Sequence, residues 1–383
     1  MITYERLFAA IDARNDEFIR VWEDCCNLES PSEDKAAVDA VGRYFLALGD
    51  AFGWKHEICP MERAGDVVCL TMNPDAAGKP IVVSGHVDTV HPVGSFGTPA
   101  VHRDETKIYG PGVCDCKGGV AAAALAMAAL GDCGFDARPI ELILQTDEEI
   151  SNRLSDKATV RYMAEKGREA EAFLNLESYK PGKIVTRRKG SMRWRITVHG
   201  TAAHSSRCWL GKNALTEAAH KIIELEKWKE EDGITCNCAI IEAGTTANSV
   251  PDTCTFTADI RFPDDAAEQY AVNRLHEICD TSYIGGTTCN AVRYTRRTSM
   301  TETDAVLGLF EKLRDIYAAA GLPAVERGMA TGGSDASDIA AYGIPCIDSI
   351  GAEGGCLHSR DEFAYLASLA ESAKRIGAAI LGL

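Results

Sequence analysis

Three short apolar runs, the first two separated by a helical stretch, are the feature of this chain that most restricts its fold. The runs are "KPIVVSGH", "RPIELILQT" and "EAFLNLES", and "GGVAAAALAMAAL" lies between the first two. Continuous apolar runs of this length are typical of strands that are buried on both faces of a parallel sheet. Parallel strands need a crossover connection, which is usually a helix. The pattern therefore predicts an α/β fold, with a mixed, largely parallel sheet that is covered by helices on both faces.

A second pattern begins near residue 190. "MRWRITVHG" and "CTFTADIRF" alternate apolar and polar residues, as expected for a sheet with one solvated face. Between them, "NALTEAAHKIIELEKW" spaces its apolar residues as a helix does. The chain has 383 residues, more than the roughly 100–200 of a usual domain. We therefore predict a smaller α+β domain over residues 190–297, inserted into a larger domain formed by residues 1–189 and 298–383.

The composition limits the partners of the chain. Its formal net charge is -16 and its pI is about 5.1, which argues against nucleic acid or an anionic membrane, because both attract basic surfaces. The longest apolar stretch is shorter than the roughly 20 residues that cross a bilayer. The first residues lack the pattern of a secretory signal, so we expect a cytoplasmic protein. Its 15 cysteines are then expected to be reduced thiols.

The stretch "SGHVDTV" ends the first apolar run with two polar residues. On a strand, alternate side chains share a face, so His86 and Asp88 are expected to point the same way while Val87 packs on the opposite side. This spacing suits a metal ligand and a residue that orients it. By itself, however, the stretch is more typical of a strand that ends in a polar loop.

Four further stretches place polar residues after apolar runs. Asp115 lies in "GPGVCDCKGG", Glu148 and Glu149 in "LQTDEEIS", Glu177 in "LNLESYKPG" and His358 in "GCLHSRDEF". Each stretch alone is typical of a solvated loop. In an open α/β sheet, however, sites form outside the carboxyl ends of the strands. Several carboxylates gathered there would repel one another unless cations neutralised them, so the five stretches together predict one or two divalent metals.

In this order, the motifs resemble those of the M20 family of dinuclear zinc peptidases and deacylases, over nearly the whole chain. The resemblance implies that Asp115 bridges two metals. It further implies that His86 and Glu177 are the terminal ligands of one metal, and Glu149 and His358 those of the other. The implied cofactor is two Zn²⁺ per chain, with Co²⁺ or Mn²⁺ as alternatives because mixed imidazole and carboxylate sites also accept them.

The resemblance assigns roles to further residues near these ligands. It implies that Glu148 is the general base and that Asp88 orients the ring of His86. The family has a non-proline cis peptide after the bridging aspartate, which here is Asp115–Cys116. One departure from the family is the turn after "DEE", where the family commonly has a glycine and this chain has "ISN" at 150–152.

The predicted inserted domain contains matches of its own. "GTAAHSS" contains His204, which by resemblance reaches the active site of a partner subunit and stabilises the oxyanion. Asn248 in "AGTTANSVPD" and Arg261 in "ADIRF" match positions that hold a substrate carboxylate, a task that suits a planar guanidinium. The alternative for Arg261 is an exposed residue on an alternating strand. Either Arg296 or Arg297 is a further candidate for substrate contact. The resemblance implies a homodimer built through residues 190–297, with hinge closure over the substrate.

These observations predict a metal-dependent hydrolase that cleaves the amide bond of an N-acyl or N-peptidyl amino acid, most like a carboxypeptidase. An N-acyl amino acid deacetylase or desuccinylase with the same mechanism is an alternative. A binding protein on the same fold is a weaker one, because the base and all five ligands are present. A nucleotide-dependent enzyme is disfavoured, since the glycines of "YGPGVCDCKGG" do not complete G-x-G-x-x-G.

Overall fold

The computed structural model describes residues 2–383, so Met1, the first residue of the predicted larger domain, lies outside the described residues. The chain forms two compact units. The first unit contains residues up to Thr186 together with Glu302–Gly328 and Ser334–Leu383. The second contains Arg187–Thr301 and also Met329–Gly333, a short segment that the sequence boundaries had placed in the larger domain.

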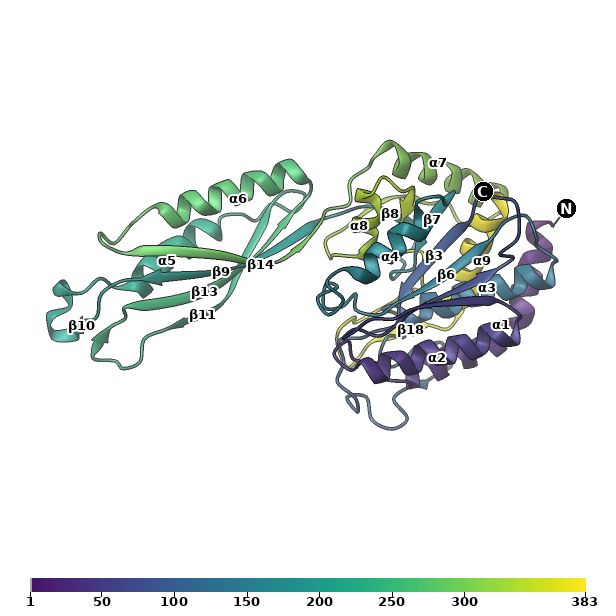
Figure 1. Ribbon diagram of the computed structural model, residues 1–383, viewed down its shortest axis with the longest axis horizontal. Coiled ribbons are helices and arrows are strands. Elements are labelled where there is room, and N and C mark those ends of the chain that lie inside the picture. The colour runs from purple at the N-terminus through teal and green to yellow at the C-terminus, as the bar shows by residue number, and fades with distance from the viewer. Residues whose placement is uncertain (1) are drawn as a thin grey trace. The chain divides into compact units, whose positions relative to one another are not determined.

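A six-stranded mixed sheet forms the centre of the first unit (Figure 1). Its central strand β3 pairs in parallel with β6 on one side and β7 on the other, and β16 adds a further parallel strand beside β7. The strands β1 and β2 are antiparallel additions at the opposite edge. The predicted fold class is therefore confirmed. In sheet order the strands are β1 (Lys55–Cys59), β2 (Val67–Met72), β6 (Ile140–Gln145), β3 (Ile81–His86), β7 (Ala172–Asn175) and β16 (Cys346–Ile347).

Helices cover both faces of this sheet. Residues such as Val83 and Leu142 face a core shared with helices α1, α3 and α9. On the other face, Gly167 at the end of α4 lies so close to Phe173 of β7 that an added Cβ would be 3.1 Å from its ring. The helices of the first unit are α1 (Tyr4–Asn27), α2 (Lys35–Ala51), α3 (Lys117–Asp132), α4 (Ala158–Gly167), α7 (Asp304–Ala319), α8 (Asp335–Ala341) and α9 (Ala367–Gly382).

The alanine-rich helix α3 is the predicted crossover between β3 and β6, and its residues from Lys117 to Leu130 are all buried. Close backbone contacts define its first turn. A Cβ on Gly118 would lie 2.3 Å from the carbonyl oxygen of Val113, and one on Gly119 would lie 2.5 Å from that of Leu176. Glycines at these two positions therefore allow α3 to begin directly beside the strand ends. Among residues 2–383, no helix has both the length and the apolar character to cross a bilayer.

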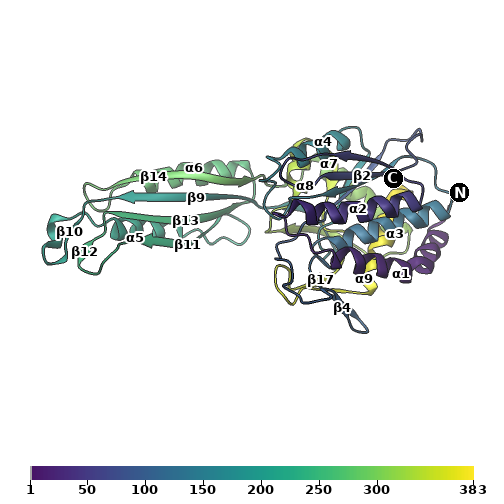
Figure 2. The ribbon, with the colours of Figure 1, turned by 60° about the horizontal axis from the view of Figure 1, so that its bottom comes forward.

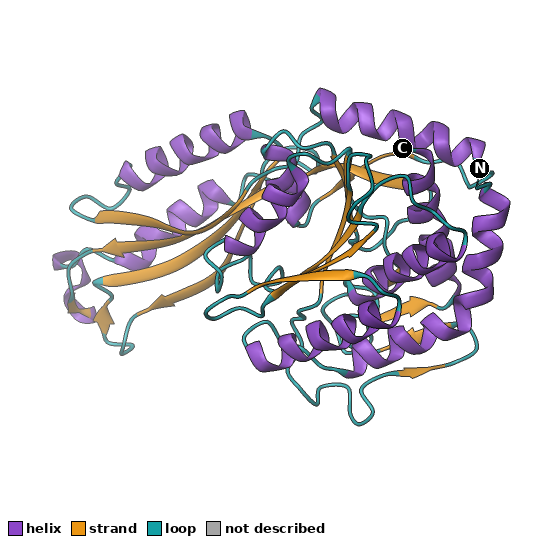
Figure 3. Cartoon of the chain, turned by 45° about the vertical axis from the view of Figure 1, so that its right-hand side comes forward, coloured by secondary structure: helices purple, strands orange, loops and turns teal. Residues whose placement is uncertain are grey.

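The second unit is an antiparallel sheet with two helices on one face (Figures 2 and 3). Its strands, in sheet order, are β11 (Thr235–Ala243), β13 (Thr253–Phe262), β9 (Gly190–His199) and β14 (Thr288–Arg297), and its helices are α5 (Ala214–Leu225) and α6 (Asp265–Asp280). The predicted alternation is present. Trp194 and Phe256, for example, are buried beneath the helices, whereas Arg193 lies on the open face.

Helix α5 buries a charged pair beside its apolar residues, while two of its large apolar side chains are exposed. Leu215 and Ile223 are 39% and 60% exposed, while Glu217 and Lys221 are almost completely buried. The Nζ of Lys221 lies 2.8 Å from Oε1 of Glu217, as an ion pair, and donates to the carbonyl oxygens of Ile278, Cys279 and Thr281. These carbonyls lie at the end of α6, where a helix has no internal donors left. The buried ion pair thus joins α5 to the end of α6.

We expect Lys221→Met to destabilise the protein by about 3–5 kcal/mol, because it leaves the buried carboxylate of Glu217 without its cation. Urea unfolding followed by circular dichroism would measure this. Lys227→Met is the matched control, since Lys227 pairs with Glu224 at the surface and exposed pairs contribute about 1 kcal/mol or less. Equal effects of the two substitutions would contradict the importance of the buried pair.

Candidate metal centre

Three adjacent parallel strands bring the predicted ligands to one edge of the sheet. His86 is the last residue of β3, Glu148 and Glu149 follow β6, and Glu177 follows β7. Because β3 pairs in parallel with both neighbours, the carboxyl ends of all three strands point the same way. This arrangement explains why residues far apart in the chain lie together.

The described residues contain two overlapping groups whose possible ligand atoms all lie within 4.8 Å of one another. One group is His86, Asp115 and Glu149, and the other is His86, Glu148 and Glu177. His86 therefore belongs to both groups. The second group also shows that Glu148, which the resemblance presents as the base, has an oxygen within ligand distance of the others.

Asp115 lies between two histidines. Its Oδ1 is 3.0 Å from Nε2 of His86, and its Oδ2 is 3.3 Å from Nε2 of His358. The same Nε2 of His358 is 3.1 Å from Oε2 of Glu149. Each carboxylate oxygen thus faces a different imidazole, as expected of a carboxylate that is shared by two cations. The peptide bond Asp115–Cys116 is cis, as the resemblance implied.

Asp88 is completely buried, and it does more than the sequence suggested. Its carboxylate is 3.5 Å from Nδ1 of His86, but its backbone carbonyl is closer to the same nitrogen, at 3.0 Å. The carboxylate instead accepts the backbone N–H groups of Glu148 and Glu149, both at 3.2 Å, and the hydroxyl of Ser32 at 2.7 Å. Asp88 therefore connects the end of β3 to the turn after β6.

The protonation of His86 tests whether a metal fits here. The carbonyl of Asp88 can only accept, so Nδ1 of His86 carries a hydrogen. In the neutral ring, Nε2 then has a lone pair that points at Oδ1 of Asp115. Because both atoms are acceptors, they lie close together favourably only when a cation or a proton is between them. With Glu149, Glu177 and His358 nearby, the nitrogen and oxygen donors suit zinc, manganese or cobalt. The residues therefore fit a divalent metal centre.

Burial and mutual contact shift the pKa values of the site. Burial raises the pKa of Glu149 to about 7, although the hydrogen bond from His358 works against this. Hydrogen bonds to Asp115 and then to Glu149 raise the pKa of His358 to about 10. Burial alone would raise the pKa of Asp115, but the hydrogen bonds from His358 and His86 outweigh it and hold that pKa well below its usual range. Burial would lower the pKa of His86, but the neighbouring Cys116, Asp115 and Asp88 outweigh it and raise that pKa well above its usual range. At neutral pH, both histidines are thus cations in this cluster.

The turn after Glu149 adopts an unusual backbone conformation. Ser151 and Asn152 both have positive φ, at 61° and 57°. A glycine reaches this region without strain, and asparagine does so more readily than most residues. The side chain of Asn152 also donates to Asp335 at 2.6 Å, which stabilises the turn from α8. This contact allows the chain to do without the glycine that the family commonly has there.

The predicted substrate residues of the second unit fall into two places. His204 and Ser249, the neighbour of Asn248, are paired in the short ladder of β10 (Ala203–His204) and β12 (Ser249–Val250). Both His204 and Asn248 are exposed. Arg261 lies elsewhere, on the open face of the sheet.

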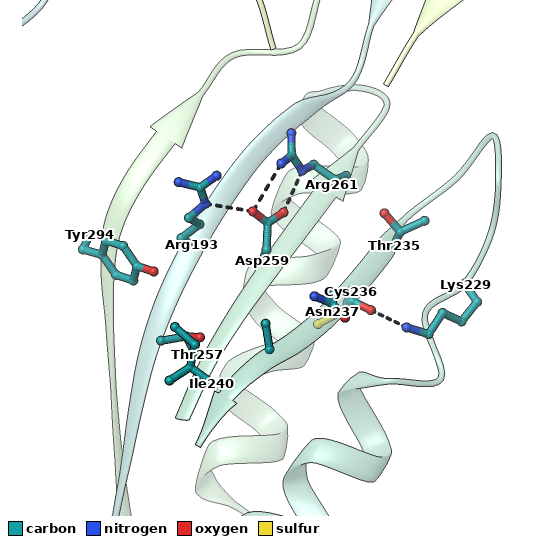
Figure 4. Close-up of a pocket in the computed structure, with 11 residues that line it drawn as sticks. Arg193, Lys229, Thr235, Cys236, Asn237, Ile240, Thr257, Asp259, Arg261 and Tyr294 are labelled. Atoms are coloured by element: carbon teal, nitrogen blue, oxygen red, sulfur yellow. Dashed lines mark hydrogen bonds and ion pairs between the residues drawn. The ribbon is translucent and has the colours of Figure 1, made fainter. Parts of the chain in front are cut away.

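Arg261 lines a cavity of about 630 Å³ (Figure 4). Its guanidinium donates to both carboxylate oxygens of Asp259, at 2.6 and 3.2 Å, and Nε of Arg193 donates to the same carboxylate at 2.8 Å. These hydrogen bonds lower the pKa of Asp259 despite its burial, which acts to raise it. Neither His204 nor Asn248 lines this cavity.

The structure also distinguishes Arg296 from Arg297. Arg296 forms a two-pronged ion pair with Glu268 of α6, at 2.6 and 2.7 Å. Arg297 is buried and packs against Gly333 so closely that an added Cβ there would be 2.6 Å from its Cδ. Sequence reasoning left the choice between them open, because neighbouring arginines give the same local signal.

Metal binding should strengthen with pH, because His86, His358 and Glu149 must lose protons to become ligands. With a His358 pKa of about 10 and a raised His86 pKa, the apparent affinity for Co²⁺ should rise at least about tenfold per pH unit between pH 7 and 8, and more steeply below the Glu149 pKa of about 7. Competition with a chromophoric chelator at pH 6, 7 and 8 would measure this. His358→Gln should flatten the dependence, and a flat dependence in the unaltered protein would contradict the proton displacement.

Comparison with known proteins indicates the family of the chain. Residues 82–381 match the family described as "Peptidase family M20/M25/M40". Carboxypeptidase G2 from a Pseudomonas species is 25% identical, over 92% of this chain and 86% of that one. Succinyl-diaminopimelate desuccinylase from Corynebacterium glutamicum is 26% identical, over 74% of this chain and 75% of that one.

Solved structures show the same fold. The structure of aminopeptidase PepT from Bacillus cereus superposes with a TM-score of 0.81 at 20% identity, covering 96% of this chain and 98% of that one. Human carnosine dipeptidase 1 has a TM-score of 0.71 at 12% identity, covering 99% of each chain. From the family match over most of its length, the chain belongs to the M20 peptidase family, whose members are metal-dependent, and it is a hydrolase that acts on amide bonds.

Proposed function

We propose that this protein cleaves the amide bond of an N-acyl or N-peptidyl amino acid, most like a carboxypeptidase, with two divalent metals. The observation that carries the proposal is Asp115, whose two carboxylate oxygens face His86 and His358. In this proposal Asp115 bridges two Zn²⁺ ions, and Co²⁺ or Mn²⁺ can replace them. The terminal ligands are His86 and Glu177 for one ion and Glu149 and His358 for the other.

When bound, two such ions would acidify a water molecule and polarise the scissile carbonyl. Glu148 is proposed to accept the proton of the attacking water and to deliver it to the leaving amine. The carboxylate of Asp88 accepts the backbone N–H groups of both Glu148 and Glu149. Asp88 thus positions both glutamates at once, while adjacent side chains leave the backbone in different directions. One glutamate can ligate while the other faces the water.

The substrate end of the proposal rests on the second unit. Asn248 and Arg261 are proposed to hold the free carboxylate of the substrate. Arg261 uses Nε and one terminal nitrogen on Asp259, which fixes the guanidinium plane and leaves its other terminal nitrogen for a further anion. Carboxypeptidase G2 among the relatives favours a peptidase. The desuccinylases among them favour the second candidate, an N-acyl amino acid deacylase with the same mechanism.

The exposed apolar surface of the second unit supports a homodimer through residues 190–297. The strand β11 is at the edge of its sheet and exposes Ile240 and Ile241, at 57% and 49%. The neighbouring helix α5 exposes Leu215 and Ile223. An edge strand with apolar side chains is a site for pairing with another chain. In such a dimer His204 is proposed to reach the partner's active site and to stabilise the oxyanion there.

The most direct test is a hydrolysis screen of N-acyl amino acids and dipeptides with Zn²⁺, Co²⁺ and Mn²⁺, combined with elemental analysis. The proposal expects about two metal ions per chain and metal-dependent release of a free amino acid. Peptide substrates turned over in preference to acetyl or succinyl ones would select the carboxypeptidase. A protein that binds no metal and gains no activity with any of the three would overturn the proposal.

Glu148→Gln should retain both metals and lower kcat by about 10²–10⁴-fold, because it removes the proton acceptor and preserves the shape of the side chain. Metal content and steady-state kinetics would measure the two effects. Glu165→Gln, an exposed glutamate of α4, is the control and should behave like the unaltered protein. Loss of a metal ion in Glu148→Gln would instead assign Glu148 as a ligand, and full activity would remove it as the base.

His204→Ala and Glu148→Gln should complement each other if His204 acts in a partner subunit. Each variant alone should be nearly inactive. A mixed dimer combines an intact Glu148 in one chain with an intact His204 from the other, so random mixing should restore about a quarter of the activity. Co-expression with two affinity tags, followed by kinetics, would measure this. Ile240→Lys should abolish the recovery by dissociating the dimer, and no recovery in a verified mixed dimer would overturn the role in trans.

A further inference from the structure

A buried carboxylate holds the loop that carries Asp115. Glu362 is 1% exposed and lies four positions after His358 in the sequence. Its Oε1 accepts the backbone N–H groups of Cys114 and Asp115, at 3.0 and 3.1 Å. Its Oε2 accepts the N–H of Gly112 at 3.3 Å and lies 3.1 Å from Nε2 of His91. One side chain thus contacts four donor atoms.

The backbone around Glu362 strengthens this connection. Its carbonyl oxygen accepts the N–H of Gly110 at 3.3 Å. The next residues form β18 (Phe363–Tyr365), which pairs with β5 (Lys107–Tyr109). The segment that follows His358 is therefore attached to the loop that contains Asp115, both through a ladder of backbone bonds and through the carboxylate.

Burying a carboxylate is costly unless it is fully hydrogen-bonded. Here the compensation comes from backbone N–H groups that converge on one anion, an arrangement that is charge-assisted and directional. The consequence is geometric. The N–H of Asp115 is itself one of the donors, so the position of its side chain depends on the place of Glu362.

We propose that Glu362 is a positioning residue of the metal centre, which fixes the bridging Asp115 relative to His358. This inference rests on the proposed function of the site. His358 and Asp115 come from segments far apart in the chain. Glu362 binds the loop that contains Asp115, and only three residues separate it from His358 in the sequence. His91 completes the arrangement, because it approaches the same carboxylate from the loop after β3.

The proposal is tested by metal affinity, the visible spectrum of the Co²⁺-loaded protein and the thermal midpoint of the metal-free protein. Glu362→Ala should bind Co²⁺ about 10–100-fold more weakly and change the cobalt spectrum, as expected when support behind a ligand is lost. Glu362→Gln should lose less. Its amide oxygen can still accept from Cys114 and Asp115, while its NH₂ group faces the N–H of Gly112 and Nε2 of His91, which can accept from it in the other tautomer.

The neighbouring Asp361 provides the control. It is exposed, so Asp361→Asn should retain the affinity and spectrum of the unaltered protein. If Glu362→Ala does not fold, Glu362→Gln decides: a weaker affinity with a changed cobalt spectrum supports the proposal. A lower thermal midpoint with an unchanged Co²⁺ affinity and cobalt spectrum would show that Glu362 only stabilises the fold, and would overturn the proposal. Metal binding by the unaltered protein separates the role of Glu362 from the proposed function. If the unaltered protein binds no metal, the proposed function itself is overturned.

Discussion

The parallel pairing of β3 with β6 and β7 is the constraint on which the site depends. His86 lies opposite Gln145, and Ser84 lies opposite Asn175, so the chain leaves all three strands at the same edge. Apolar residues on both faces hold this register, since a slip of one residue would turn every side chain to the opposite face. The core therefore determines where the carboxylates meet, and they could not be gathered by their own mutual interactions, which are repulsive.

Two buried carboxylates hold the backbone of this cluster in place through hydrogen bonds. Asp88 accepts the N–H groups of Glu148 and Glu149, and Glu362 accepts that of Asp115. Each binds the backbone of residues whose side chains form the metal centre. The acidic cluster is thus supported from behind by groups whose partners are amides of the main chain.

The second unit shows where periodicity alone misleads. The alternation of β9 and β13 correctly predicted which residues are buried, because a strand has only two faces and the apolar one faces the helices. In α5 the apolar residues also recur at helical spacing, yet Leu215 and Ile223 are exposed and Glu217 and Lys221 are buried. Periodicity tells which residues share a face. Ala218 and Leu225 do lie in the core, but the burial of Lys221 beside them depends on the carbonyl groups at the end of α6, about which the sequence of α5 contains no information.

The sequence by itself determined the α/β class, the strands and crossover helix of the first unit, and the order of polar residues at the strand ends. These features follow from local patterns of apolar and polar residues. Only the tertiary structure decided that Glu362 is buried while Asp361 is exposed, that Arg297 packs on Gly333 while Arg296 pairs with α6, and that Asp88 binds the turn after β6. The physical reason is that each choice is made by hydrogen bonds and contacts between distant segments, and neighbouring residues of one kind give the same signal in the sequence.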